Sequence, residues 1–368
     1  MTRAVYRSPA CALRVNVDDQ AVYDWLSEFL TPCLQAEADA APALCDVRLV
    51  IDHEAFHALK ARGAAPSGAL LDSFRLDHGL IRLPLWRGDG AAVTVFDEAL
   101  EAFYCRRRSG EPVDVVAAVD SARARVALMR VVRELTMTRL VAAGWLIVHA
   151  AAFVIDGRAV LVVGPKRAGK TTLLTYALTT GAAPCLLAND RVAIALDGSR
   201  AAWGVPTIVS LRVAMMRRFP VLACRLQSGR YDFRFSQREL ETVREGAVDV
   251  APAEAWSVTP MQYCDLVGAS LGLQATVSAI VFPQLMDDGR SIELQSIDAA
   301  EAAGHLSASV FRPHSIDALF TSREGGHPPS EADLVKASAM FIDRSARYAC
   351  RIGADAEDDG VWIKALAS

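Results

Sequence analysis

The 368-residue chain lacks the features that mark secreted and disulfide-rich proteins. Its eight cysteines are scattered, without a C-x-x-C pair or zinc-ligand spacing, so we expect reduced and mostly buried thiols. No secretory signal is visible, because the short apolar stretch after Arg3 and Arg7 is interrupted by Pro9 and Arg14. These absences favour a cytoplasmic protein.

Long apolar runs and a strong charge are also missing. The longest apolar run, residues 140–155, is short for a bilayer span and contains Gly144 and His149, so we expect it in a protein core rather than a membrane. The net charge of −4 gives no general reason to expect nucleic acid as a partner. With 52% hydrophobic residues and no internal repeat, the composition predicts a globular protein of two domains.

The most specific pattern present is G-x-x-x-x-G-K-[ST], a phosphate-binding loop of nucleoside-triphosphate enzymes. The apolar run Ala159–Val163 before it predicts a buried strand, and the apolar stripe at Leu173, Leu174, Ala177 and Leu178 predicts a helix after it. An ordinary glycine turn would not explain the Lys-Thr pair. We expect the nucleotide to be bound by Gly164, Pro165, Lys166, Arg167, Ala168, Gly169, Lys170, Thr171 and Thr172.

Each residue type in this loop suits a phosphate. Gly164 and Gly169 allow backbone conformations that turn successive N–H groups inward. Lys170 can reach the β- and γ-phosphates, and the Thr171 hydroxyl can ligate Mg²⁺. The expected cofactors are therefore ATP and Mg²⁺.

A second apolar run, residues 184–188, predicts a strand that ends at Asn189-Asp190-Arg191. Asp190 can hold Mg²⁺ or accept a proton from an attacking hydroxyl, and the sequence leaves both roles open. A turn-forming Asn-Asp pair is the plainer alternative.

His149-Ala150-Ala151, the loop and residues 188–192 together resemble the catalytic core of the HPr kinase/phosphorylase family. In that family a histidine lies shortly before the loop and an Asp-Asp pair lies on the strand after it. The resemblance covers residues 145–205, with weaker likeness at 279–283 and 351–355. It implies an α/β fold with a P-loop, HPr-kinase-like (PEP-carboxykinase-like) core and a smaller N-terminal α+β domain.

The resemblance also implies an activity, namely transfer of the γ-phosphate of ATP to a hydroxyl of a peptide or small molecule. It assigns catalysis to Asp190, His149 and Lys170, and metal binding to Thr171, Asp190 and Asn189. His149 can orient Asp190 or contact the γ-phosphate, and a hydrogen-bonded core histidine is the alternative.

Two positions depart from the family pattern. Asn189 replaces the first aspartate, and an amide can offer an oxygen to Mg²⁺ but cannot act as a base. Lys166 and Arg167 stand where small polar residues are usual, and their charges attract polyphosphate or an acidic substrate. The second hypothesis is therefore an ATP-binding switch or assembly subunit that transfers no phosphate.

Residues 1–118 predict the α+β domain, and residues 119–368 the nucleotide-binding domain. The first domain is expected to recognise the acceptor or a partner, and a homo-oligomer is allowed. It does not resemble the partner domain of the regulatory enzyme, so HPr is not the expected acceptor. The predicted elements are helices over residues 20–34 and 121–143 and strands over residues 12–17, 47–51, 80–85, 92–96 and 145–154.

Two further patterns have several interpretations. Residues 212–244 hold eight arginines against three acidic residues, with Tyr231, Phe233 and Phe235 among them. They predict a lid over an anionic ligand, a solvated surface or a nucleic-acid patch on an ATPase. Residues 53–57 fit the zinc-protease signature H-E-x-x-H, but no further H-x-x-G-x-x-H follows, so we expect an exposed helical turn.

Overall fold

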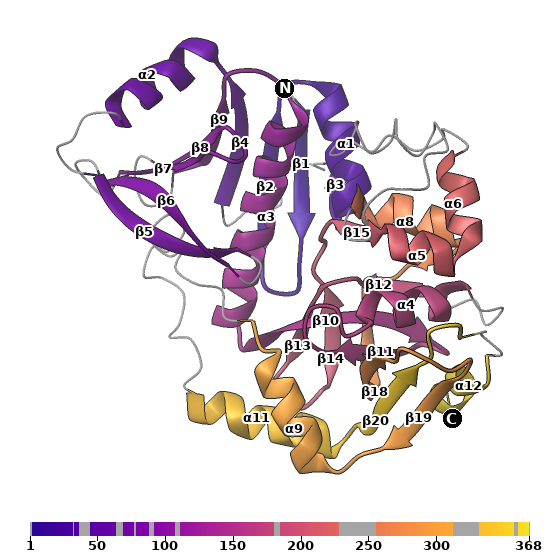
Figure 1. Ribbon diagram of the computed structural model, residues 1–368. Helices are drawn as coiled ribbons and strands as arrows, with labels where there is room; N and C mark the ends of the chain where they lie inside the picture. Colours follow the sequence, from indigo (N-terminus) through magenta and orange to yellow (C-terminus); the bar gives the residue numbers. More distant parts are fainter. Residues whose placement is uncertain are drawn as a thin grey trace. The chain divides into compact units, whose positions relative to one another are not determined.

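The computed structural model describes residues 2–31, 33–36, 45–63, 69–76, 79–87, 92–106, 111–179, 185–227, 255–311, 331–356 and 360–367. It is a mixed α/β protein whose sheets combine parallel and antiparallel strands (Figure 1). The chain forms two compact units, residues 1–143 and residues 144–311 with 328–368. Residues 312–327 lie outside the described residues.

The first unit contains a nine-stranded sheet in the order β3-β1-β2-β4-β9-β8-β7-β6-β5. Strands β2, β4 and β9 are parallel, and the remaining neighbours are antiparallel. Its elements are β1 (Thr2–Arg7), β2 (Ala12–Val17), α1 (Gln20–Leu30), β3 (Leu34–Ala36), β4 (Cys45–Ile51), α2 (His53–Gly63), β5 (Ala69–Leu76), β6 (Gly79–Arg87), β7 (Val93–Asp97), β8 (Ala102–Arg106), β9 (Val113–Ala117) and α3 (Ala122–Ala142).

Helix α1 is shorter than predicted. It ends at Leu30, and Thr31 is extended, with φ −64° and ψ 139°. Residue 32 is a proline, which disfavours helical backbone in the residue before it. Leu34, the expected helix end, instead begins β3. The four predicted strands of this region are confirmed as β2, β4, β6 and β7.

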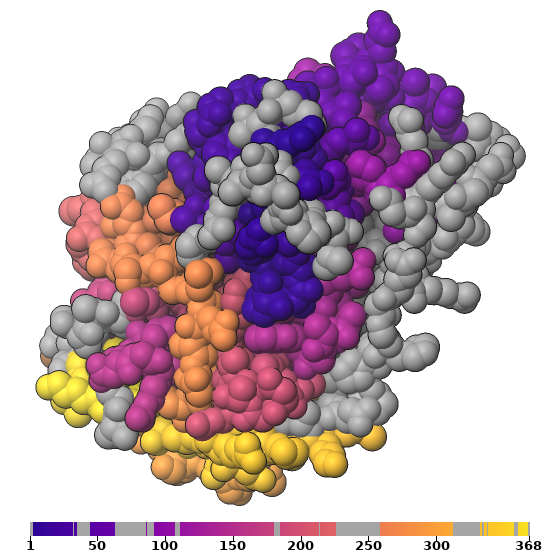
Figure 2. Space-filling view, turned by 180° about the vertical axis from the view of Figure 1, so that it is seen from behind, coloured from indigo at the N-terminus to yellow at the C-terminus, as the bar shows by residue number. Residues whose placement is uncertain are grey.

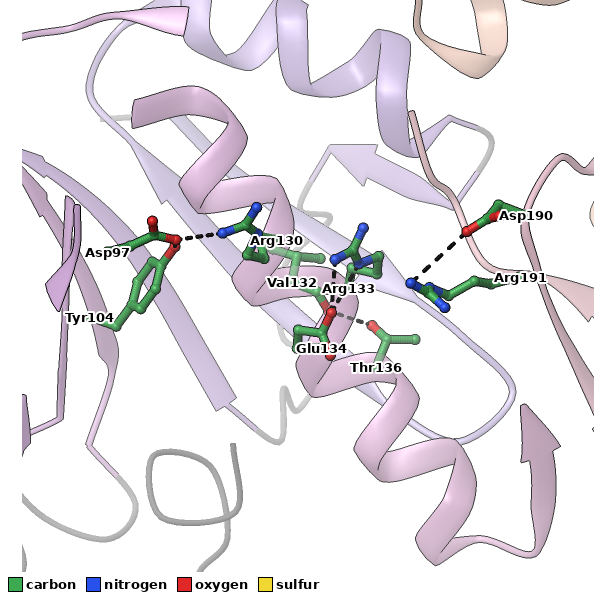
Figure 3. A network of polar contacts seen from close by, with 9 residues as sticks. All are labelled: Asp97, Tyr104, Arg130, Val132, Arg133, Glu134, Thr136, Asp190 and Arg191. Atoms are coloured by element: carbon green, nitrogen blue, oxygen red, sulfur yellow. Dashed lines mark hydrogen bonds and ion pairs between the residues drawn. The ribbon is translucent and has the colours of Figure 1, made fainter. Parts of the chain in front are cut away.

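A buried polar cluster joins α3 to the sheet of the first unit. The carboxylate of Asp97, 2% exposed, accepts hydrogen bonds from the Tyr104 hydroxyl at 3.0 Å, from the Leu100 N–H at 3.1 Å and from Arg130 (Figure 3). Arg130 lies on α3, whereas Asp97 and Tyr104 lie on β7 and β8. Helix α3 therefore belongs to the first unit, although its sequence was assigned to the second domain.

The second unit contains another nine-stranded sheet, in the order β17-β12-β10-β13-β14-β18-β20-β19, with β11 paired to β10 and β18. A separate two-stranded sheet joins β15 and β16. The elements are β10 (Trp145–Ile155), β11 (Arg158–Val163), α4 (Lys170–Thr179), β12 (Cys185–Ala188), β13 (Arg191–Ala195), β14 (Ala201–Gly204), β15 (Val209–Arg212), α5 (Val213–Arg218), α6 (Pro220–Gln227), β16 (Ala255–Val258), α8 (Pro260–Val267), β17 (Ser270–Leu271), β18 (Gln274–Leu285), β19 (Ile292–Ser296), α9 (Ala299–Ala308), α11 (Glu331–Asp343), β20 (Ala346–Ile352) and α12 (Val361–Ala367).

The long strand β10 is covered on both faces, which explains its continuous apolar sequence. Ala150 and Ala152 face a core that includes residues of α9 and α11, and these two helices lie side by side (Figures 1 and 2). Ala151 and Phe153 face a second core that includes residues of α4, α5 and α8. The apolar run at residues 140–155 is thus confirmed as mainly core.

Three parallel strands bring their carboxyl ends to one edge of this sheet. Strand β11 pairs in parallel with β18, which pairs in parallel with β20. Their last residues are Val163, Leu285 and Ile352. Open α/β sheets bind ligands at such an edge, and here the glycine-rich loop leaves from it.

None of the described helices is long and apolar enough to cross a membrane. The eight cysteines are all free, in agreement with the reduced thiols expected from their spacing.

Candidate functional site

The glycine-rich loop connects β11 to α4, as the sequence predicts. Arg167 and Gly169, on either side of Ala168, have positive φ values of 73° and 104°. Alternation of this kind turns neighbouring backbone N–H groups toward a common point, which favours an anion there. Gly169 is also tightly packed, because a Cβ at this position would lie 3.0 Å from Leu285 Cγ and 3.2 Å from Ile352 Cδ1.

Lys170 begins α4, and its side chain folds back into the loop. Its Nζ donates hydrogen bonds to the Gly164 carbonyl at 2.8 Å and to the Pro165 carbonyl at 3.0 Å. Burial lowers the pKa of Lys170 to about 8, although the nearby charge of Asp190 opposes that effect. At pH 7 the loop therefore holds a buried cation whose hydrogen-bond partners are neutral carbonyls.

Asp190 follows β12, and the structure brings it to His149 of β10. The His149 Nε2–H donates to Asp190 Oδ1 at 2.8 Å. Burial alone would raise the pKa of Asp190, but this hydrogen bond and the charges of Arg191 and Lys170 outweigh it and hold the pKa well below its usual value. The Asp190 carboxylate is consequently ionised at neutral pH, with 32% of its side-chain surface exposed.

The pairing of β10 with β13 explains this contact. His149 is the ladder partner of Arg191, so the residue just before Arg191 lies within reach of the imidazole. The residues 309–311 lie against the same part of β10, where the His149 N–H donates to the Ser309 carbonyl at 2.8 Å. His149 is thus fixed by its backbone while its ring holds Asp190.

Arg191 was missed as a site residue by the sequence analysis. Its side chain is 4% exposed, and its Nη2 lies 3.9 Å from Asp190 Oδ2 (Figure 3). Its guanidinium also lies over the ring of Phe311, with Cζ 4.0 Å from the centroid, which is a favourable cation–π distance. An arginine at the start of an otherwise apolar strand was the available signal, whereas Phe311 has no local signal.

The side chain of Asn189 is bound by the segment before β15. Its Nδ2 donates to the Ile208 carbonyl at 3.0 Å, and its Oδ1 accepts from the Thr207 hydroxyl at 2.8 Å. Asn189 therefore ties the end of β12 to the segment before β15. The amide oxygen already accepts one hydrogen bond, so one lone pair remains for the expected contact with a metal ion.

The donors near the loop fit a triphosphate with a bound magnesium ion. Inward backbone N–H groups and Lys170 suit phosphate oxygens, while the Thr171 hydroxyl and the Asp190 carboxylate are hard oxygen ligands of the kind that Mg²⁺ prefers. Thr172 is buried, and Lys166 and Arg167 are exposed to solvent. Gly164, the first residue of the loop, is closely packed, because an added Cβ would be 3.2 Å from Ala168 Cβ.

Helix α4, which follows the loop, is joined to α8 by a side-chain contact. The hydroxyls of Thr175 on α4 and Tyr263 on α8 form a buried hydrogen bond of 2.7 Å. Helix α8 begins with a complete capping box between Thr259 and Gln262 and ends at Gly268 in a left-handed conformation. The Thr175–Tyr263 hydrogen bond therefore ties the middle of α4 to a well-capped helix.

The described parts of the two remaining sequence patterns make other contacts. Of the arginine-rich segment, residues 228–254 lie outside the described residues. Arg218 at the end of α5 donates to the carbonyls of Gly353 and Ala354. His53 and His57 are exposed on α2 with ring centroids 4.3 Å apart, which confirms the exposed helical turn.

The chain matches no protein-family model and no curated protein.

Proposed function

We propose that the protein is an ATP-dependent phosphotransferase of the HPr-kinase-like type, which moves the γ-phosphate to a hydroxyl of a peptide or small molecule. The observation that carries the proposal is the position of Asp190. An ionised carboxylate, held by His149 at 2.8 Å, interacts with the charge of the loop lysine, Lys170. A phosphate loop whose lysine interacts electrostatically with a carboxylate held by a histidine has the parts that phosphoryl transfer requires.

Each residue has a defined role in this proposal. The loop N–H groups and Lys170 bind the phosphates, and Asp190 accepts a hydrogen bond from the acceptor hydroxyl and orients it. A bound Mg²⁺, held by Thr171 and Asp190, would neutralise charge on the phosphates. The hydroxyl oxygen bonds to the γ-phosphorus as the bond to the β-phosphate oxygen breaks, and the hydroxyl proton leaves through Asp190.

The lowered pKa of Asp190 bears on how it works. A carboxylate with a low pKa is a weak base, so it holds a proton poorly. Phosphoryl transfer through a loose transition state depends more on positioning and charge than on early proton removal. Orientation by His149 and full ionisation are therefore the properties that the site supplies.

A second candidate is a nucleotide-dependent switch that transfers no phosphate. Two facts favour it: Asp190 is the one carboxylate in the 189–190 pair, and the amide nitrogen and oxygen of Asn189 already have partners in Ile208 and Thr207. In such a protein, ATP binding would alter which partners the protein contacts, and no phosphate would be transferred.

The Asp190→Asn substitution separates these functions. Purified protein is incubated with γ-labelled ATP, Mg²⁺ and a metabolite or peptide extract, and the label is followed. For a phosphotransferase, ATP affinity should stay within about threefold, while transfer falls by about 10²-fold or more, as expected on loss of an orienting carboxylate. Asp197→Asn is the matched control, since Asp197 is exposed in the turn after β13.

Transfer that persists in the Asp190→Asn protein would move the chemistry to another residue. Tight ATP binding by the wild-type protein with no labelled acceptor in any extract would instead support the switch.

A further inference from the structure

The charged groups of the site lie on one side of β11, which bears on where the nucleoside of a bound nucleotide lies. In the second unit, β11 pairs with β10 on one edge and with β18 on the other. Asp190, whose charge acts on the pKa of Lys170, lies on the β10 side, since it follows β12 and contacts His149 of β10. If the terminal phosphate lies with Lys170 and Asp190, the linear phosphate chain leads toward β18 and β20.

On that side the loop packs against an apolar residue that is only partly covered. Leu285, the last residue of β18, contacts the position of Gly169 and remains 41% exposed. The preceding core residues of β18, Val281 and Phe282, are buried. Nucleotide sites are lined mostly by apolar side chains with a few polar groups, so an uncovered leucine next to a phosphate loop suits a base.

Two backbone segments behind Leu285 are locked together. Four hydrogen bonds of 2.9–3.2 Å join residues 286–291 to residues 352–355. A Cβ on Gly353 would lie 2.4 Å from the Gly289 carbonyl oxygen, so only glycine allows this approach. Arg218 donates to the carbonyls of Gly353 and Ala354, and the Tyr176 hydroxyl donates to the Ala356 carbonyl at 2.7 Å.

These contacts make a fixed wall beside the loop. Tyr176 lies on α4, so the same helix that carries Lys170 also anchors residues 353–356. Because these hydrogen bonds within the protein hold the wall, little of it has to be ordered by a ligand, which lowers the entropy that binding would cost.

We propose that the nucleoside of the bound nucleotide lies on the β18 and β20 side of the loop. Its base packs against Leu285, and the edge of the base faces the wall formed by residues 286–290 and 353–356. The proposal rests on nucleotide binding at the loop, which is part of the proposed function. It adds a nucleoside subsite that the loop motif does not specify.

Leu285→Ser tests the proposal, and Leu273→Ser is its matched control. Leu273 directly precedes β18, is 43% exposed, and stands at the opposite end of the strand, about 35–40 Å away for a strand of this length. Calorimetric titrations use two probes, Mg²⁺-ATP and Mg²⁺-tripolyphosphate. Leu285→Ser should weaken ATP binding about tenfold and leave tripolyphosphate binding unchanged, whereas Leu273→Ser should change neither.

A measurement on the wild-type protein covers the case in which Leu285→Ser does not fold. With ¹³C-labelled leucine methyls, ATP should shift the Leu285 signals strongly, and tripolyphosphate should shift them little. Equal affinity of the wild-type protein for ATP and tripolyphosphate, or equal effects of the two serine substitutions, would overturn the nucleoside subsite and leave the phosphate site intact. Absence of binding to both probes would instead contradict the proposed function and the subsite together.

Discussion

Replacing Lys170 with methionine should stabilise the protein while abolishing nucleotide binding. Lys170 is 8% exposed, and burial lowers its pKa from 10.5 to about 8. Because an unfolded lysine keeps the higher value, the charged side chain lowers the free energy of unfolding at pH 7 by roughly 3 kcal/mol. A buried cation retained at this cost is expected where function requires it.

The net effect of Lys170→Met is smaller, because the substitution also removes two hydrogen bonds. Those to the carbonyls of Gly164 and Pro165 contribute about 1 kcal/mol each. The free energy of unfolding should therefore rise by about 1 kcal/mol at pH 7. The penalty on the wild-type lysine is complete below pH 8 and is relieved between about pH 8 and 10.5, so the advantage of the variant should disappear in that range.

Urea unfolding of both proteins at pH 7 and pH 9.5 measures this difference, and thermal melts with and without Mg²⁺-ATP measure binding. ATP should raise the melting temperature of the wild-type protein only. Lys364→Met is the control, since Lys364 is exposed on α12 and its loss should change the free energy of unfolding by less than about 0.5 kcal/mol. A Lys170→Met protein that is less stable at pH 7 and still stabilised by ATP would refute the reasoning.

Three substitutions test how the backbone of the second unit is packed. Asn189→Asp should lower the free energy of unfolding by about 1–3 kcal/mol, because aspartate cannot donate to the Ile208 carbonyl, and it should not raise phosphate transfer. Urea unfolding and the transfer of label from ATP measure these two effects. Increased transfer would show that residue 189 limits the reaction. Gly204→Ala should destabilise by about 3 kcal/mol or more, since its Cβ would lie 1.8 Å from the Leu187 carbonyl oxygen. Gly304→Ala in α9, with nothing within 4 Å of the added Cβ, should instead stabilise by up to about 1 kcal/mol, and equal melting temperatures for the two variants would contradict this packing.

The elements nearest the loop were predictable because their signals are local. Apolar runs before and after the loop gave β10, β11, α4 and β12 close to their observed bounds, since both faces of these strands are buried. The end of α1 was predicted four residues late, although residue 32 is a proline. Strands such as β1, β8 and β9 were not predicted, because a run of five or six residues gives a weak signal and its pairing in the sheet is not visible in the sequence.

The arrangement of the site depends on pairing that sequence spacing does not encode. His149 and Asp190 are forty-one positions apart, and their contact follows from the register of β10 against β13. Orientation of Asp190 by His149 was one of two roles considered, and this hydrogen bond is present. The contacts of Asn189 with Thr207 and Ile208 have no sequence motif, and neither has the contact of Leu285 with the position of Gly169.

A crystal structure with Mg²⁺ and a non-hydrolysable ATP analogue is the most direct measurement of nucleotide binding at residues 164–172. The phosphates should lie inside the loop, with Lys170 Nζ moved from the carbonyls of Gly164 and Pro165 to the β- and γ-phosphate oxygens, and with Asp190 facing the terminal phosphate. An analogue bound elsewhere, or a loop in which Lys170 keeps its contacts with the two carbonyls at saturating analogue, would contradict a nucleotide site at this loop.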